Sequence, residues 1–214
     1  ICYDAYNRIF FRAGVGEVVA VAPKRLLDSR DSRQFSTPAP EYKAVITTPD
    51  GHSLTIGESV ATIEGLRVEI AVGEDALREE CKLEGAVLSQ LCDVVLNPTA
   101  VPATAGSYER RREQLRAQTQ RLCRASVMAS AGFGESSTDS AWAGDCVVAS
   151  CGEILAEGVR FSTEGVLTTA DISIENIHRQ REGATLQPSA EAFDQYTKRP
   201  TPPTCAEPNP FTPK

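Results

Sequence analysis

At 214 residues, with 41% hydrophobic and 24% charged residues, the chain has the size and composition of one globular domain rather than of a disordered protein. A formal net charge of −7 argues against nucleic acid as its main ligand, and no apolar run approaches the roughly 18 residues that span a membrane. The chain opens with Ile1 rather than Met and shows no cleavable signal pattern, which predicts a processed protein or a fragment.

Short β-prone runs dominate the first third of the chain. Residues 9–11 and 18–21 are apolar and separated by glycines, so they predict a hairpin. Residues 42–56 alternate around Pro49-Asp50-Gly51, a turn in which proline presets φ and glycine supplies a positive φ. Residues 66–72 alternate between apolar and polar side chains and predict a half-buried strand.

Helices and buried-looking strands follow one another after residue 74. The spacing of apolar and polar residues predicts helices over 75–91, 107–124 and 175–182. Apolar or small-residue runs predict strands at 93–96, 126–131, 146–150, 154–155 and 166–172. This alternation predicts an α/β fold. We expect one domain over residues 1–198 and a proline-rich, extended tail over 199–214.

The seven cysteines do not form a metal-binding or disulfide pattern. Their number is odd, no CxxC spacing occurs, and most lie in apolar runs. This favours buried thiols in a reducing compartment. Zinc ligands usually come in close pairs, whereas the two histidines, His52 and His178, lie far apart. We therefore expect no metal and no cofactor.

Three further features have ordinary structural interpretations. The glycine-rich segment 132–138 lacks the lysine of a phosphate-binding loop and is interpreted as a turn. Six arginines between residues 110 and 124 predict a solvated, ion-paired helix face. His178 lies among polar residues and is expected at the surface, and His52 lies in a turn. With so few histidines, a Ser-His-Asp or Cys-His catalytic site is not expected.

Two candidates for chemistry remain. Lys24 follows an apolar strand and Pro23, and the pair Glu74-Asp75 follows the strand over 66–72. Each also has a structural interpretation, because a lysine at a strand end is usually solvated and an acidic pair often caps a helix. Neither candidate by itself identifies a reaction.

Several segments carry a family resemblance in their order along the chain. They are Tyr6-Asn7-Arg8-Ile9-Phe10-Phe11, Val21-Ala22-Pro23-Lys24, Asp93-Val94-Val95-Leu96-Asn97, the run 130–144, residues 152–157, Arg160-Phe161 and the segment 209–213. Together they resemble the nitrilase superfamily of carbon–nitrogen hydrolases, and within it the glutaminase domain of glutamine-dependent NAD+ synthetases. The resemblance covers most of residues 6–183 and is most specific in the C-terminal half.

The resemblance implies an α-β-β-α sandwich that lacks its first strand and helix. It also implies a glutamate base, an oxyanion-stabilising lysine and a cysteine nucleophile that the amide acylates. Lys24 matches the lysine, and Glu74 would bind substrate. The cysteine should stand directly before the acidic pair, at Gly73, or at Ala71 in an alternative register, and neither residue has a sulfur. The glutamate would lie upstream of the first residue.

Another cysteine is a poor substitute for the lost nucleophile. Cys81 lies two helical turns past the strand end, about 12 Å away at 1.5 Å per residue. Cys92 lies where the next buried strand begins. The resemblance therefore argues for the fold and against the activity.

Three hypotheses follow from the sequence. The first is a degenerate hydrolase-like domain that acts as a structural or interaction subunit, in a hetero-oligomeric assembly with other protein chains. The alternative is the glutaminase portion of a glutamine-dependent NAD+ synthetase, seen as a fragment or nucleophile variant. A third is a small-molecule binding site in which Lys24 and Glu74 hold a carboxylate or amine. The expected compartment is the cytoplasm, with the mitochondrion as the alternative.

Overall fold

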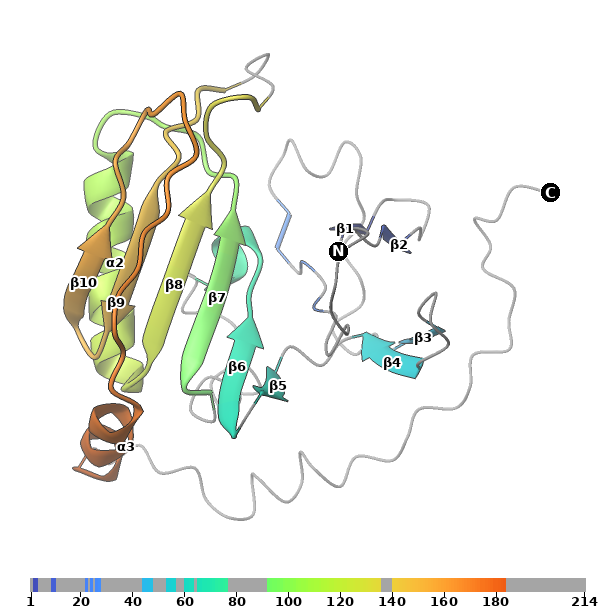
Figure 1. Cartoon of the computed structure of the whole chain (residues 1–214), viewed down its shortest axis with the longest axis vertical. Coiled ribbons are helices and arrows are strands. Elements are labelled where there is room, and N and C mark those ends of the chain that lie inside the picture. The colour runs from blue at the N-terminus through green and yellow to red at the C-terminus, as the bar shows by residue number, and fades with distance from the viewer. Residues whose placement is uncertain are drawn as a thin grey trace.

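A computed structural model describes residues 2–3, 9–10, 22, 24, 26–27, 44–47, 53–56, 60–63, 65–76, 92–135 and 140–183. At its centre lies a mixed sheet of six strands, in the order β10-β9-β8-β7-β6-β5 (Figure 1). Their bounds are β5 Val60–Ile63, β6 Leu66–Ile70, β7 Val94–Thr99, β8 Ala125–Ser130, β9 Cys146–Ser150 and β10 Glu153–Glu157. β7 runs parallel to β6 and β8, and the outer pairs are antiparallel. The expected α/β class is confirmed.

Two small antiparallel pairs lie outside this sheet. β3 (Ala44–Thr47) pairs with β4 (Ser53–Ile56), with Ala44 opposite Ile56, which confirms strands on either side of the predicted turn. β2 (Ile9–Phe10) pairs with β1 (Cys2–Tyr3). The sequence instead predicted a partner for this strand at residues 18–21, which lie outside the described residues.

One face of the main sheet is covered by helix α2 (Ser107–Leu122) (Figure 1). Its buried residues recur every four positions, at Ser107, Arg111, Leu115 and Thr119, so they form one stripe facing the sheet. Leu115 packs there against buried side chains of β8 and β9, namely Met128, Val147 and Ala149. The helix ends at Cys123, whose left-handed φ of 43° turns the chain into β8.

Helix α3 (Ile174–Gly183) packs on the sheet near the amino end of β7 and confirms the helix predicted over 175–182. Ile177 is fully buried on α3 against Val94 of β7 and Ala125 of β8. Val94 and Ala125 are the first residues of the parallel strands β7 and β8. The described core therefore includes one cluster beneath α2 and one beneath α3, on opposite faces of the same strands, and a third cluster of Ala71, Ala76, Cys92 and Val95.

Two predicted elements differ from the structure, and one observed strand was not predicted. Residues 165–173 form neither helix nor strand, so the strand predicted over 166–172 is wrong. A Cβ built on Gly158 would lie 2.7 Å from the Thr168 hydroxyl and 2.9 Å from the Cys146 Cβ, so this segment lies against β9. Instead of a helix beginning at residue 75, a 3-10 turn spans Gly73–Ala76, and residues 77–91 lie outside the described ranges. β5 was not predicted.

Within the described ranges, no helix is both long and apolar enough to cross a membrane. The helices that are described, α2 and α3, carry charged residues along their length.

Candidate functional site

The site predicted from sequence lies where β6 ends. The strand stops at Ile70, and the chain turns through the 3-10 segment Gly73–Ala76 beside the carboxyl half of β7. β6 and β7 are parallel, with Ile70 opposite Leu96. The carboxyl ends of parallel strands are the usual place for ligands in α/β proteins, because the loops there are free to diverge. The turn at Gly73 is at such an edge.

Lys24 and Gly73 lie next to one another at this turn, although they are far apart in sequence. Gly73 is buried and has a left-handed φ of 63°. A Cβ built on it would lie 2.7 Å from the Lys24 Nζ atom. A side chain at position 73 would therefore point directly at the lysine ammonium, which is the juxtaposition that nucleophile and oxyanion groups require.

The alternative register at Ala71 has a different environment. Ala71 is 7% exposed and packs in a core cluster with Ala76, Cys92 and Val95. Its backbone N–H still donates to the Leu96 carbonyl at 3.0 Å, so it continues the strand pairing. Position 71 thus lies in the core, whereas position 73 faces Lys24. The assignment of roles to these two positions remains a prediction.

The acidic pair is part of the same turn. Asp75 accepts a hydrogen bond from the Leu26 N–H at 2.8 Å, which ties the segment carrying Lys24 to the turn carrying Gly73. Glu74, the predicted substrate-binding residue, lies between Gly73 and Asp75 in the sequence, and its side chain is half-buried. The structure therefore brings Lys24, Gly73 and the acidic pair together, as the sequence predicted for adjacent site residues.

Asn97 is a residue of this site that sequence reasoning did not assign. It is 1% exposed on β7, and its Nδ2 donates to the carbonyls of Ala71 at 2.7 Å and Gly73 at 2.9 Å. Its Oδ1 atom is buried without a hydrogen-bond partner. The signal was present in the sequence, because Asn97 is a polar residue that directly follows the apolar run Val94-Val95-Leu96. We call Lys24, Gly73 and Asn97 the Gly73 site.

Cys92 does not serve as a substitute nucleophile. It lies five residues before Asn97, roughly 16 Å away along an extended chain. Its thiol is fully buried, 3.3 Å from Glu69 Oε2 and 3.5 Å from Arg124 Nη1. Burial raises the pKa of Cys92 to about 12, with a further contribution from Glu69, so the thiol is not ionised near neutral pH. Cys81 lies outside the described residues.

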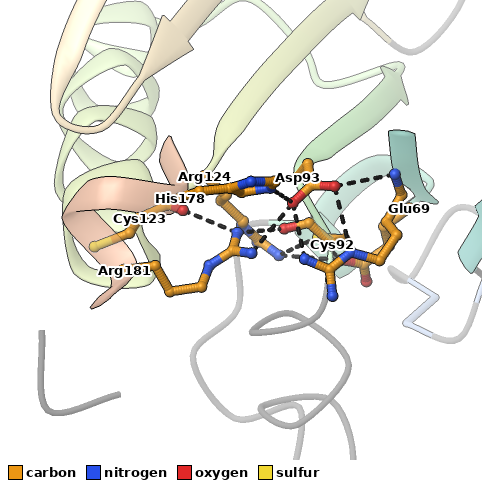
Figure 2. Close-up of polar contacts among 8 residues, drawn as sticks. Glu69, Cys92, Asp93, Cys123, Arg124, His178 and Arg181 are labelled. Carbon is orange, nitrogen blue, oxygen red and sulfur yellow. Dashed lines mark hydrogen bonds and ion pairs between the residues drawn. The ribbon is translucent and has the colours of Figure 1, made fainter. Parts of the chain in front are cut away.

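A second polar cluster lies at the amino end of β7, and Figure 2 shows it. Asp93 is 1% exposed and accepts hydrogen bonds from Arg67 at 3.0 Å and Arg181 at 3.1 Å, and His178 lies 3.0 Å away. Burial by itself would raise the pKa of Asp93, but hydrogen bonds from the Arg67 side chain and backbone outweigh it and hold the pKa at about 2. We call Arg67, Asp93, His178 and Arg181 the Asp93 network.

The Asp93 network fastens α3 to the sheet. Arg181 also donates to the carbonyls of Cys92 at 2.9 Å and Cys123 at 3.0 Å (Figure 2). Both carbonyls lie outside the paired strands, just before β7 and just after α2. These contacts satisfy backbone acceptors at a helix end and a strand start. His178 was predicted at the surface, and it is half exposed, yet its ring contacts Asp93 across 85 residues of sequence. The network is thus structural.

The arginine-rich segment 110–124 is only partly a solvated face, so that prediction is wrong for Arg111 on α2 and for Arg124, which lies just beyond the end of α2. Arg111 is 5% exposed and forms an ion pair with buried Asp145, and Arg124 is 4% exposed and pairs with Glu69 at 3.0 Å. Arg116 is exposed, as predicted, and pairs with Glu113. The reason for the difference is the stripe on α2: Arg111 lies one turn before Leu115 and faces the sheet.

The glycine-rich segment beginning at Gly132 is described up to residue 135. A Cβ on Gly132 would lie 3.1 Å from the Cα of Gly144, so glycine at 132 permits two backbone segments to approach closely. Gly134 has a φ of 97°, which glycine adopts without strain. Both observations agree with a turn. Across the described residues, no group of three or more His, Cys, Asp or Glu side chains is arranged to hold a metal ion.

The chain is similar in sequence to curated glutamine-dependent NAD(+) synthetases. Glutamine-dependent NAD(+) synthetase of Mycobacterium leprae is 31% identical over 179 residues, which cover 78% of this chain and 25% of that protein. The protein of the same name from Mycobacterium bovis is 32% identical over 198 residues, covering 82% and 27%. The chain therefore spans about a quarter of the length of these relatives. No protein-family model matches the chain.

The structure of the chain is also similar to solved structures of synthetases of the same name. A glutamine-dependent NAD(+) synthetase from Cytophaga hutchinsonii matches with a TM-score of 0.58 at 16% identity, covering 70% of this chain and 24% of that one. The expected relationship to glutamine-dependent NAD+ synthetases is confirmed by the sequence similarity. A second synthetase, from Acinetobacter baumannii in complex with ADP, matches with a TM-score of 0.50 at 20% identity, covering 68% and 24%. At these identities the solved structures show a shared α/β fold.

Proposed function

We propose that this chain is the glutaminase-type, carbon–nitrogen hydrolase portion of a protein of the glutamine-dependent NAD+ synthetase kind, in a variant form whose nucleophile position is Gly73. The observation that carries the proposal is the 2.7 Å between the Cβ position of residue 73 and Lys24 Nζ. The sequence similarity to two mycobacterial synthetases supports the same assignment. The site is proposed to receive the side-chain amide of glutamine.

The chemistry of the Gly73 site explains what such a variant keeps and what it lacks. The Lys24 ammonium is placed to stabilise negative charge on the oxygen of an amide carbonyl next to residue 73. Glycine supplies no thiol, so no acyl-enzyme forms at this position. We therefore expect the natural chain to bind a glutamine-like amide without releasing ammonia through a covalent intermediate.

The test introduces a cysteine sulfur at position 73. Gly73→Cys in the full chain is treated with a chloroketone analogue of glutamine, whose carbon forms a bond to the thiolate sulfur as chloride leaves. The label at position 73 is then quantified by peptide mass spectrometry. We expect roughly tenfold faster labelling than with a chloroketone of equal reactivity that lacks the amino-acid head group, which corresponds to about 1.4 kcal/mol of differential binding. Lys24→Met in the same background is expected to slow the labelling.

The matched control is Gly65→Cys. Gly65 also has a positive φ, 82°, and nothing lies within 4 Å of its Cβ position. A thiol there has no ammonium beside it and no binding site around it, so it should react equally with both chloroketones. Equal labelling of the position 73 thiol by both reagents would overturn the proposal.

A second candidate function is a structural or interaction subunit within a hetero-oligomeric assembly. It is favoured by the absence of a thiol at Gly73 and by large exposed apolar side chains at Phe133 (77%), Phe161 (63%) and Leu167 (89%). Native mass spectrometry of the chain purified from its source distinguishes the two. Stoichiometric unrelated chains would favour this subunit role, and a lone chain that binds glutamine would favour the first proposal.

The compartment we propose is the cytoplasm, with the mitochondrion as the alternative. Cys92 and Cys123 are buried thiols on neighbouring elements, which suits a reducing environment. Localisation of the tagged full-length protein by fractionation tests this, and secretion into an oxidising compartment would contradict it.

A further inference from the structure

We infer that Asn97 is a positioning residue of the Gly73 site, whose carboxamide holds the backbone at residue 73 so that its Cα–Cβ direction meets Lys24. The inference rests on the proposed function, because it gives Asn97 a task in presenting the nucleophile position. It assigns a role to the most buried polar side chain at this end of β7, which packing alone does not explain.

Regular pairing between β6 and β7 ends just before the site. The last paired residues are Ile70 and Leu96, and the Ala71 N–H then donates to the Leu96 carbonyl at 3.0 Å. Beyond this point the Asn97 side chain takes over the link, by donating to the carbonyls of Ala71 and Gly73. A side-chain link lets the chain leave the strand and enter the left-handed conformation at Gly73. Asn97 thus defines the shape of the turn.

The orientation of the Asn97 amide is set by its partners. Carbonyl oxygens only accept hydrogen bonds, so the NH2 group must face Ala71 and Gly73, at 2.7 and 2.9 Å. The amide oxygen is then left buried without a partner. An unpaired buried acceptor is unfavourable, so the bonds that the NH2 group donates must outweigh its cost. The two donated bonds are what this residue contributes.

A second link sets the position of the lysine relative to the same turn. Asp75 accepts from the Leu26 N–H at 2.8 Å, two residues along from Lys24. Asn97 therefore fixes the side of the turn that carries residue 73, and Asp75 fixes the segment that carries the ammonium. The separation of 2.7 Å between the Cβ position and Nζ depends on both links. Removing the Asn97 amide should let residue 73 relax away from Lys24.

The experiment measures the acidity of a thiol placed at position 73. In the Gly73→Cys full chain, the rate of alkylation by iodoacetamide is followed against pH, with the peptide carrying position 73 quantified by mass spectrometry. Beside the Lys24 ammonium, the thiol should titrate about one pH unit below the ordinary value of about 8.5. Adding Asn97→Ala should return the midpoint to about 8.5. Asn97→Ser, which keeps one donor, should give an intermediate midpoint.

The control separates positioning from stability. Val147→Ala removes fully buried methyl groups in the core cluster beneath α2, away from the turn. It should destabilise the Gly73→Cys chain to unfolding by urea without changing the midpoint of the thiol titration. If Asn97→Ala is too unstable to study, Asn97→Ser provides the same comparison.

Two outcomes would overturn the inference: an unshifted thiol in Gly73→Cys alone, or a shifted thiol whose midpoint ignores both Asn97 substitutions. Iodoacetamide carries no glutamine-like group, so this titration does not depend on glutamine recognition. A failed preference for the glutamine chloroketone with an Asn97-dependent midpoint would overturn the proposed function and leave the positioning role standing. The reverse pair of results would overturn the positioning role alone.

Discussion

The two ends of β7 hold polar groups of different kinds. At the amino end, Asp93 is surrounded by Arg67, His178 and Arg181, and the cluster draws in backbone carbonyls as well (Figure 2). At the carboxyl end, the uncharged Asn97 donates two hydrogen bonds to the turn at Gly73 and leaves its Oδ1 buried and unpartnered. Buried ion pairs hold the amino end together, whereas at the carboxyl end the turn brings Gly73 next to Lys24, which makes that end the candidate site.

The physical reason for this difference is the cost of desolvation. A buried carboxylate must be paired and hydrogen-bonded, or it destabilises the fold. Asp93 meets this condition with partners from β6 and α3, so its contacts are explained by the fold. A cluster of charged side chains at one end of the strand therefore does not by itself mark a ligand site.

The largest expected effect is on stability at the amino end. Asp93→Ala removes the shared acceptor of Arg67 and Arg181, which are 33% and 11% exposed, and leaves both cations unpaired. We expect the free energy of unfolding in urea to fall by about 3–5 kcal/mol. Arg116→Gln is the matched control, because it breaks an exposed pair with Glu113 and should cost about 0.5 kcal/mol or less. An equal loss of unfolding free energy in Asp93→Ala and Arg116→Gln would contradict a structural role for the Asp93 network.

Cys92 should resist alkylation. Burial raises the pKa of its thiol from 9.0 to about 12, so its thiolate is about a thousandfold scarcer than that of an ordinary cysteine, at tenfold per unit of pKa. Native protein is treated with iodoacetamide at pH 8, and the Cys92 peptide is quantified by mass spectrometry. The same protein in urea provides the fully reactive reference. Rapid labelling in the native protein would return Cys92 to the list of candidate nucleophiles.

The pH dependence of stability should reflect Asp93. Its pKa is lowered from 3.8 to about 2, so ionised Asp93 contributes fully above pH 4 and the contribution is lost as the pH falls through 2. The shift corresponds to about 2 kcal/mol. The midpoint can be read from the carboxyl carbon shift of Asp93 by NMR. Arg67→Met should raise it toward 3.8, and a midpoint already near 3.8 in the natural protein would contradict the network.

The smallest expected effect concerns the carboxyl end. Gly73→Ala should cost about 1–2 kcal/mol, because alanine is strained at a φ of 63°. Gly65→Ala, at a φ of 82° with open space around its Cβ, should cost about the same. The contact with Lys24 should add little, since Nζ is the end of a flexible side chain. A much larger loss at Gly73, measured by urea unfolding, would mean that Lys24 cannot move aside for a side chain.

Much of the fold follows from local sequence pattern. The apolar run at residues 94–96 and the small-residue run at 126–130 lie in paired central strands. The polar segment with Leu115 at its centre forms α2 within two residues of the predicted bounds. These patterns hold because burial on a sheet or under a helix imposes a fixed spacing of apolar residues. The prediction of a strand over 166–172 was wrong. An apolar segment that packs against a sheet without pairing has the same composition as a strand of that sheet, so the sequence pattern does not separate the two.

The candidate site was predictable in part. Lys24 was singled out by its place after an apolar strand and by family resemblance, Gly73 by the resemblance alone, and the structure brings them together. Arg111 was expected in solvent and is buried, whereas His178 is exposed as expected. The sequence pattern did not reveal their partners Asp145 and Asp93, which lie 34 and 85 residues away. No local pattern records contacts over such separations. That a charged residue such as Arg111 lies on the buried face of a helix becomes clear only when the packing of the helix on the sheet is known.

The sequence by itself determined the α/β class, the central strands, α2 and α3, and the absence of a thiol at position 73, since each depends on residue type and short-range spacing. Only the tertiary structure decided which polar groups meet: Asn97 beneath Gly73, Lys24 beside it, and Asp93 with its cations at the other end. Parallel strands place residues distant in sequence at one edge, and hydrogen bonds fix their separation to tenths of an ångström.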